Sequence, residues 1–155
     1  MSIQPHAGNE RRSVATFRIR LLFRHPTIDP ALITQALGVE PTTQARVGDR
    51  VRPARDGSLR HGIERESAWG LSAEYRDAYR DTDPNLNERL TSFLEPLMPH
   101  AAVVRKLAAE STLANVDLEF PGQYHFGGEL SPNVLRKVYN LGLTLGIEVF
   151  PDSAT

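Results

Sequence analysis

The sequence predicts a single α+β domain, in which an antiparallel or mixed sheet carries its helices on one face. Two observations support this fold class. Apolar residues alternate with polar ones in several short segments, as in half-buried strands, and the segments between them show helical spacing. A strand-helix-strand order occurs near both ends of the chain, which is typical of a ferredoxin-like fold or a relative of it. The chain could then consist of two strand-helix-strand halves.

The first half of the chain contains the better marked elements. Alternation from Val14 to Arg24 predicts the first strand, and the segment from Pro30 to Leu37 has the apolar stripe of a helix. A short strand is expected from Thr43 toward Gly48. A polar insert follows, and a returning strand is expected around Trp69, which alternates with Leu71 and is predicted to anchor the core.

The second half repeats these signals. A helix is expected from Leu86 to Leu97, a break at Pro99, and another helix from His100 to Glu110. A strand from Ala114 to Phe120, a helix after Pro132 and a last strand from Leu145 to Val149 complete the domain.

Residues of the helix ends are expected to be structural anchors. Asp29, Asp83 and Ser131 each precede a proline and can cap a helix, since Pro30 and its counterparts suit the first helical turn. Gly38 can end the first helix in a left-handed conformation.

Charges on the polar faces of the strands predict which strands are neighbours. Arg18 and Arg20 lie on the polar face of the first strand, and Asp117, Glu119 and Glu148 lie on the polar faces of two others. Opposite charges on one open face favour cross-strand pairs, each worth about 0.2 to 1 kcal/mol. We expect this face to be solvated, with its carboxylates exposed.

Composition limits the classes of function. The chain has 155 residues, 40% of them hydrophobic, which fits one domain at residues 14–151 with a frayed segment at 1–13 and a tail at 152–155. A net charge of −1 predicts no general attraction to nucleic acid or membranes. The chain has no cysteine, and its start lacks the apolar core of a signal peptide, so a cytoplasmic location is expected.

No local motif predicts catalysis, a metal site or a cofactor. The five histidines form no metal-binding pattern, and the chain has no nucleophile elbow and no phosphate-binding glycine loop. We therefore predict no catalytic residues, no metal and no cofactor.

An arginine-rich insert before Trp69 is the best candidate for a binding site. Its candidate contact residues are Arg46, Arg50, Arg52, Arg55, Arg60, His61 and Arg65. Arginine binds carboxylates and phosphates in planar geometry, which suits an acidic protein surface or a nucleic-acid backbone. The insert has its own acidic residues and no interleaved aromatics, so a solvated hairpin around Asp56-Gly57 is the simpler interpretation.

The sequence resembles the bacterial family of domains of unknown function numbered 4279. The resemblance rests on Asp29-Pro30, the run Leu37-Gly38-Val39-Glu40-Pro41-Thr42, the pair Gly48-Asp49, the segment Trp69-Gly70-Leu71-Ser72 and the Leu130-Ser131-Pro132 helix start. It covers about Val14 to Phe150. It implies a compact α+β domain and brings no established catalytic residues.

These features are compatible with three functions. The first is a non-enzymatic module that binds another protein, as an accessory or immunity-type factor, through the insert or an open sheet edge, where self-association is also conceivable. The second is a hydrolase-class enzyme with a site gathered from His61, His125, Asp117 and the arginines. The third is binding of an anion or nucleic acid by the insert.

Overall fold

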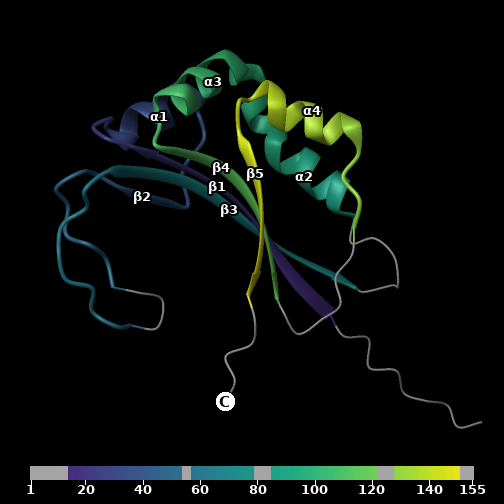
Figure 1. Cartoon of the computed structure of the whole chain (residues 1–155), viewed down its shortest axis with the longest axis horizontal. Helices are drawn as coiled ribbons and strands as arrows, with labels where there is room; N and C mark the ends of the chain where they lie inside the picture. The colour runs from purple at the N-terminus through teal and green to yellow at the C-terminus, as the bar shows by residue number, and fades with distance from the viewer. Residues whose placement is uncertain (1–13, 54–56, 79–84, 122–127, 151–155) are drawn as a thin grey trace, which may run out of the picture.

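The computed structural model shows two layers, a five-stranded sheet and a layer of helices that covers one of its faces (Figure 1). It describes residues 14–53, 57–78, 85–121 and 128–150. The strands are β1 (Val14–His25), β2 (Thr43–Ala45), β3 (Ser67–Ala78), β4 (Leu113–Pro121) and β5 (Thr144–Phe150). The helices are α1 (Pro30–Leu37), α2 (Leu86–Leu94), the 3₁₀ helix η1 (Glu95–His100), α3 (Ala101–Glu110) and α4 (Pro132–Asn140). The predicted fold class is confirmed.

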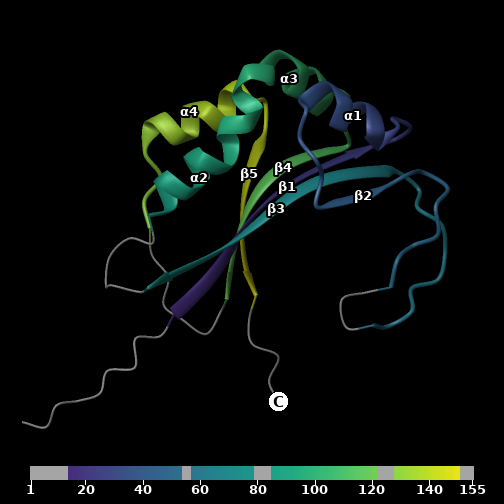
Figure 2. The same ribbon diagram turned by 180° about the vertical axis from the view of Figure 1, so that it is seen from behind.

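The sheet is mixed, with the strand order β2-β3-β1-β4-β5. The central strand β1 is antiparallel to both β3 and β4, and β2 is antiparallel to β3, whereas β4 and β5 are parallel. The two predicted strand-helix-strand units are present but differ in pairing. In β4-α4-β5 the two strands are neighbours, whereas β3 lies between β1 and β2. Figure 2 shows the same arrangement from behind.

The alternation of β1 divides core from surface as predicted. Phe17, Ile19, Leu21 and Phe23 are all buried against the helices. The intervening arginines lie on the opposite face, which no described helix covers (Figures 1 and 2). The helices complete the core with their buried residues Ile33, Leu37, Leu86, Leu90, Leu94, Leu97, Val104, Leu107, Val134 and Val138.

Trp69 is fully buried and connects the sheet to α1. Its indole Nε1 donates a hydrogen bond to Thr34 Oγ1 at 2.9 Å, and its ring lies 6.1 Å from that of Phe23, centroid to centroid. Burying the ring while satisfying its one polar group stabilises this contact. The prediction that Trp69 anchors the core is confirmed.

The helix ends show why α1 and α4 begin where they do. Asp29 and Ser131 cap these helices by accepting hydrogen bonds from the backbone of Ala31 and Val134, and each is followed by a proline. Gly38 ends α1 with a left-handed φ of 63°. These anchors are confirmed.

α2 begins at Leu86, the first residue of the predicted apolar stripe. Its N-cap position is Asn85, with a left-handed φ of 52° that asparagine tolerates better than most residues. Asp83, the cap predicted from the sequence, lies outside the described residues. After α2, Pro96 and Pro99 fall within η1, which leads directly into α3.

No helix in the described part of the chain is long and apolar enough to cross a membrane.

Candidate functional site

The connection from β2 to β3, residues 46–66, extends away from the sheet as an arm (Figures 1 and 2). Backbone hydrogen bonds hold its two sides together near the base. Gly48 N donates to Glu64 O at 2.8 Å, Glu64 N donates to Asp49 O at 2.7 Å, and Val51 N donates to Gly62 O at 3.1 Å. The arm therefore begins as an ordered hairpin, as predicted, while the residues 54–56 at its centre are not described.

The base of the arm is fixed to the domain by a tight corner. Gly48 has a φ of 89°, which glycine adopts without strain, and Asp49 Oδ2 accepts a hydrogen bond from Arg46 N at 2.8 Å. Val47 N donates to the buried hydroxyl of Ser67 at 3.0 Å. These contacts fix the direction in which the arm leaves the β2–β3 edge of the sheet.

The surface of the arm combines cations with exposed aliphatic side chains. Of the predicted contact residues, the structure exposes Arg46, Arg50, Arg52, Arg60, His61 and Arg65, whereas Arg55 lies outside the described residues. Leu59 and Ile63 are 75% and 64% exposed. The arm therefore presents both apolar side chains and cations to the solvent.

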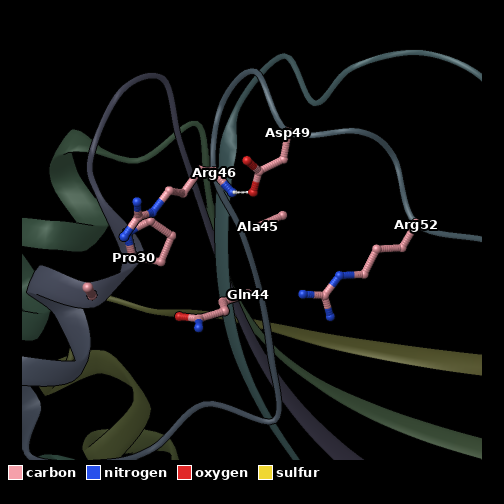
Figure 3. A pocket seen from close by; sticks show the side chains of 7 residues that line it. Pro30, Gln44, Ala45, Arg46, Asp49 and Arg52 are labelled. Atoms are coloured by element: carbon pink, nitrogen blue, oxygen red, sulfur yellow. Dashed lines mark hydrogen bonds between the residues drawn. The ribbon is translucent and has the colours of Figure 1, made fainter.

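A groove of about 330 Å³ lies where the base of the arm meets the N-terminus of α1 (Figure 3). It is lined by Pro30, Ala31, Gln44, Ala45, Arg46, Asp49 and Arg52. Figure 3 shows the Arg52 side chain directed from the arm toward Gln44 and Ala45. The groove brings two of the predicted arginines to one site.

The two arginines of the groove differ in their partners. Arg46 Nη2 forms an ion pair with Asp29 Oδ2 at 3.0 Å, which ties the arm to the cap of α1. Arg52 forms no ion pair with any described residue. Its guanidinium is available to a carboxylate or phosphate of a ligand.

A second polar constellation lies on the open face of the sheet and confirms the predicted strand neighbours. Arg18 bridges Glu74 and Glu119, with N···O distances of 3.0 and 3.3 Å. Arg20 lies 3.4 Å from Asp117 and 3.6 Å from Glu148. Its Nε is 2.9 Å from Glu119 Oε1, but the angle is poor, so this contact is an ion pair and not a hydrogen bond.

The expectation that these carboxylates are solvated was wrong. Asp117 and Glu119 are only 4% and 6% exposed, because the arginines of β1 and the neighbouring strand β5 cover them. Burial raises the pKa of Asp117, because it penalises the charged form, and this is the largest effect. The charge of Arg20 lowers the pKa, the charge of Glu148 raises it, and the hydrogen bond from Arg20 lowers it.

Two residues of the enzyme hypothesis, His61 and Asp117, lie on separate parts of the structure. His61 lies on the arm beyond β2, at one edge of the sheet, whereas Asp117 lies on β4 with β1 and β3 between them. His125 is outside the described residues. Within the described ranges, no three histidine, aspartate or glutamate side chains are grouped so that they could hold a metal ion.

Residues 14–150 match the family model named Domain of unknown function (DUF4279). The chain therefore belongs to this family, as its helix-end and turn motifs indicated. No curated protein and no solved structure matches the chain.

Proposed function

We propose that this domain is a non-enzymatic binding module that engages another protein through the arm and the groove at its base. The observation that carries the proposal is the exposure of Leu59 and Ile63 on an arm that stands away from the core, where Arg50, Arg52, Arg60 and Arg65 form no ion pair with a described residue. Exposed aliphatic residues gain from burial against a partner, about 25 cal/mol per Å² of apolar surface. Arginine is also enriched among the residues that contribute most to binding.

The charge of the arm favours an acidic partner surface. Arg52 opens into the groove, and Arg50, Arg60 and Arg65 project from the arm. Guanidinium groups pair with carboxylates in two-pronged geometry, which orients the partner as well as attracting it. The absence of cysteine suits a reducing compartment, so we place this accessory or immunity-type role in the cytoplasm of a bacterium.

Partner capture from a lysate of the source cells tests the proposal. The native chain is compared with the double variant Arg52→Glu/Arg60→Glu. The control is Lys106→Glu/Arg136→Glu, which makes the same change of net charge on the exposed surfaces of α3 and α4. We expect the arm variant to retain less than about a tenth of the captured partner, since like charges at an interface cost several kcal/mol, and the control to retain it.

Two results would count against the proposal. One is capture that is equal for the native chain and the arm variant. The other is retention of the native chain on DNA or RNA that disappears at high salt and in the arm variant, because this would assign the arm to nucleic acid instead.

A further inference from the structure

The outer edge of β5 is unpaired and unusually apolar. β5 is the last strand of the sheet, and no segment in the described part of the chain pairs with its outer side. Ile147, Val149 and Phe150 are 65%, 62% and 54% exposed. In Figures 1 and 2 the end of β5 extends beyond the helices. Edges of this kind pair readily with another strand.

The opposite side of the sheet is protected in a way that β5 is not. β2 pairs only with residues 68–70 of β3, and no other described segment pairs with that side of β3. That edge carries Glu74 and Arg76, both exposed. Charged residues on an edge strand discourage the addition of further strands. The sole charged residue of β5 is Glu148.

The register of β4 and β5 shows which side chains of β5 lie on each face of the sheet. Leu118 is paired with Ile147, so Ile147 lies on the helix-covered face of the sheet, as does Val149. Glu119 is paired with Glu148, and Asp117 with Gly146, so the positions 146 and 148 lie on the open face beside the buried carboxylates. One face of the edge is aliphatic, and the other carries Glu148 beside Asp117, with Phe150 at the end of the strand.

Among the described residues, the open face as a whole has four carboxylates and four arginines, but its ion-pair network has more carboxylates than cations. The three carboxylates of Asp117, Glu119 and Glu148 share Arg20 on the side nearest β5. Four carboxylates, those of Glu74, Asp117, Glu119 and Glu148, surround the two guanidiniums of Arg18 and Arg20. Arg24 and Arg76 share this face but form no ion pair with a described carboxylate. Glu148 is the carboxylate nearest the edge, and its side chain is 45% exposed.

We propose that the edge of β5 binds an extended segment of a partner protein, which adds as a sixth strand with aliphatic residues on one face and lysine or arginine on the other. The aliphatic residues would cover Ile147 and Val149. A basic side chain beside Gly146 would meet Glu148 and reach across the missing side chain toward Asp117, since neighbouring strands are about 4.8 Å apart. This surface is separate from the arm and extends the proposed function to a second contact.

The charges at this edge favour a basic partner segment over the β5 strand of a second copy of the chain. An antiparallel pair of β5 strands centred on Ile147 would place Glu148 of the second copy opposite Gly146. That arrangement adds a negative charge beside Asp117 and Glu148, where carboxylates are already in excess. Like charges on adjacent strands are destabilising, whereas a basic side chain at the same place is not.

Two labelled peptides of the length of β5 test the proposal against the purified domain by fluorescence anisotropy. Both have valine at alternate positions; one has lysine and the other glutamate between the valines. We expect the lysine peptide to bind at least about tenfold more tightly, and high salt to reduce this preference. Amide hydrogen exchange of β5 should slow when the lysine peptide binds, because the added strand occupies the free backbone groups.

Variants locate the binding site. Ile147→Lys should weaken binding of the lysine peptide at least about tenfold, and Glu148→Gln should reduce the preference for lysine over glutamate. Val103→Lys, a matched change of an exposed aliphatic residue on α3, should alter neither. The arm variant Arg52→Glu/Arg60→Glu should bind the lysine peptide like the native chain, so failure of the arm and failure of the edge are distinguishable.

Three results would overturn the proposal. They are equal affinity for the two peptides, binding that survives Ile147→Lys, and a dimer of the native chain that Ile147→Lys dissociates, since the last would assign the edge to a second copy.

Discussion

Gly146 lies beside Asp117 in the parallel pair of β4 and β5, and the Asp117 carboxylate occupies the space that a side chain at position 146 would fill. Glycine within a strand costs backbone entropy and contributes no packing. Here it allows a buried carboxylate to lie between two strands and face Arg20. The glycine and the carboxylate therefore form one structural unit.

Gly146→Ala is expected to lower the free energy of unfolding by about 1 to 3 kcal/mol, the usual cost of overpacking. The added Cβ atom would collide with Asp117 Oδ1, and the carboxylate could move only by weakening its contact with Arg20. Urea denaturation followed by Trp69 fluorescence measures the change, since Trp69 is the sole tryptophan.

The double variant Gly146→Ala/Asp117→Ala provides the control for this explanation. Removing the carboxylate removes the collision, so the double variant should be more stable than the sum of the two single losses predicts. Strict additivity would show that the alanine acts through the strand backbone and not through Asp117.

Asp117 is expected to make stability depend on pH in a direction opposite to that of most paired carboxylates. Its pKa is raised above the usual 3.8, chiefly by burial. Its stabilising contribution is therefore fully present below pH of about 3.8 and is lost as the pH rises through the folded-state pKa. Above that pH the native state holds a buried charge that the unfolded state solvates.

Asp117→Asn keeps the shape of the side chain and removes its titration. The stability of this variant minus that of the native chain should rise as the pH increases from about 3.8 toward neutrality, then level off. Denaturation at a series of pH values measures this difference. A difference that is constant with pH, or that falls, would show that Arg20 outweighs burial.

Arg20 is expected to be the most important single charge for stability. It contacts Asp117, Glu119 and Glu148, and two of these carboxylates are buried. Arg20→Met removes the cation from these carboxylates but keeps the aliphatic part of the side chain. It should lower the free energy of unfolding by more than about 2 kcal/mol. Buried charges left without a partner cost about 3 to 5 kcal/mol, and the expected loss is smaller because Arg20 itself is partly exposed.

Arg46→Met is the matched control for Arg20. Arg46 also pairs with a carboxylate, that of Asp29, but both side chains are largely exposed. The expected loss is at most about 1 kcal/mol. Equal losses for the two variants in thermal or urea denaturation would contradict the distinction between a buried and a surface ion pair.

Local sequence signals were sufficient to predict β1 and the starts of α1 and α4. The alternation of β1 separated Phe17 from Arg18, and the caps at Asp29 and Ser131 were correctly identified, because both effects act within a few residues. The same local pattern predicted a cap at Asp83, which lies outside the described residues, and the N-cap position of α2 is Asn85. A capping residue before a proline shows that a helix can begin, but the chain that follows decides where it does.

The burial of Asp117 and Glu119 could not be predicted in the same way. Alternation assigned them to the correct face, but their exposure depends on the strand order, which places β4 between β1 and β5. The role of Gly146 becomes visible only with the register of that parallel pair. Non-local pairing, and not residue type, decides both.

The hydrogen bond from Trp69 to Thr34 leads to the last prediction. Thr34→Val removes the hydroxyl that accepts the indole N–H at 2.9 Å, while keeping the shape of the side chain. Because Trp69 is fully buried, its N–H would lose its partner without gaining water, at a cost of about 1 to 3 kcal/mol in the free energy of unfolding. Thr34→Ser keeps the hydroxyl and should recover most of this loss. Denaturation curves followed by the fluorescence of Trp69 compare the two variants, and an equal loss for both would show that the methyl group of Thr34, and not its hydroxyl, holds the indole in place.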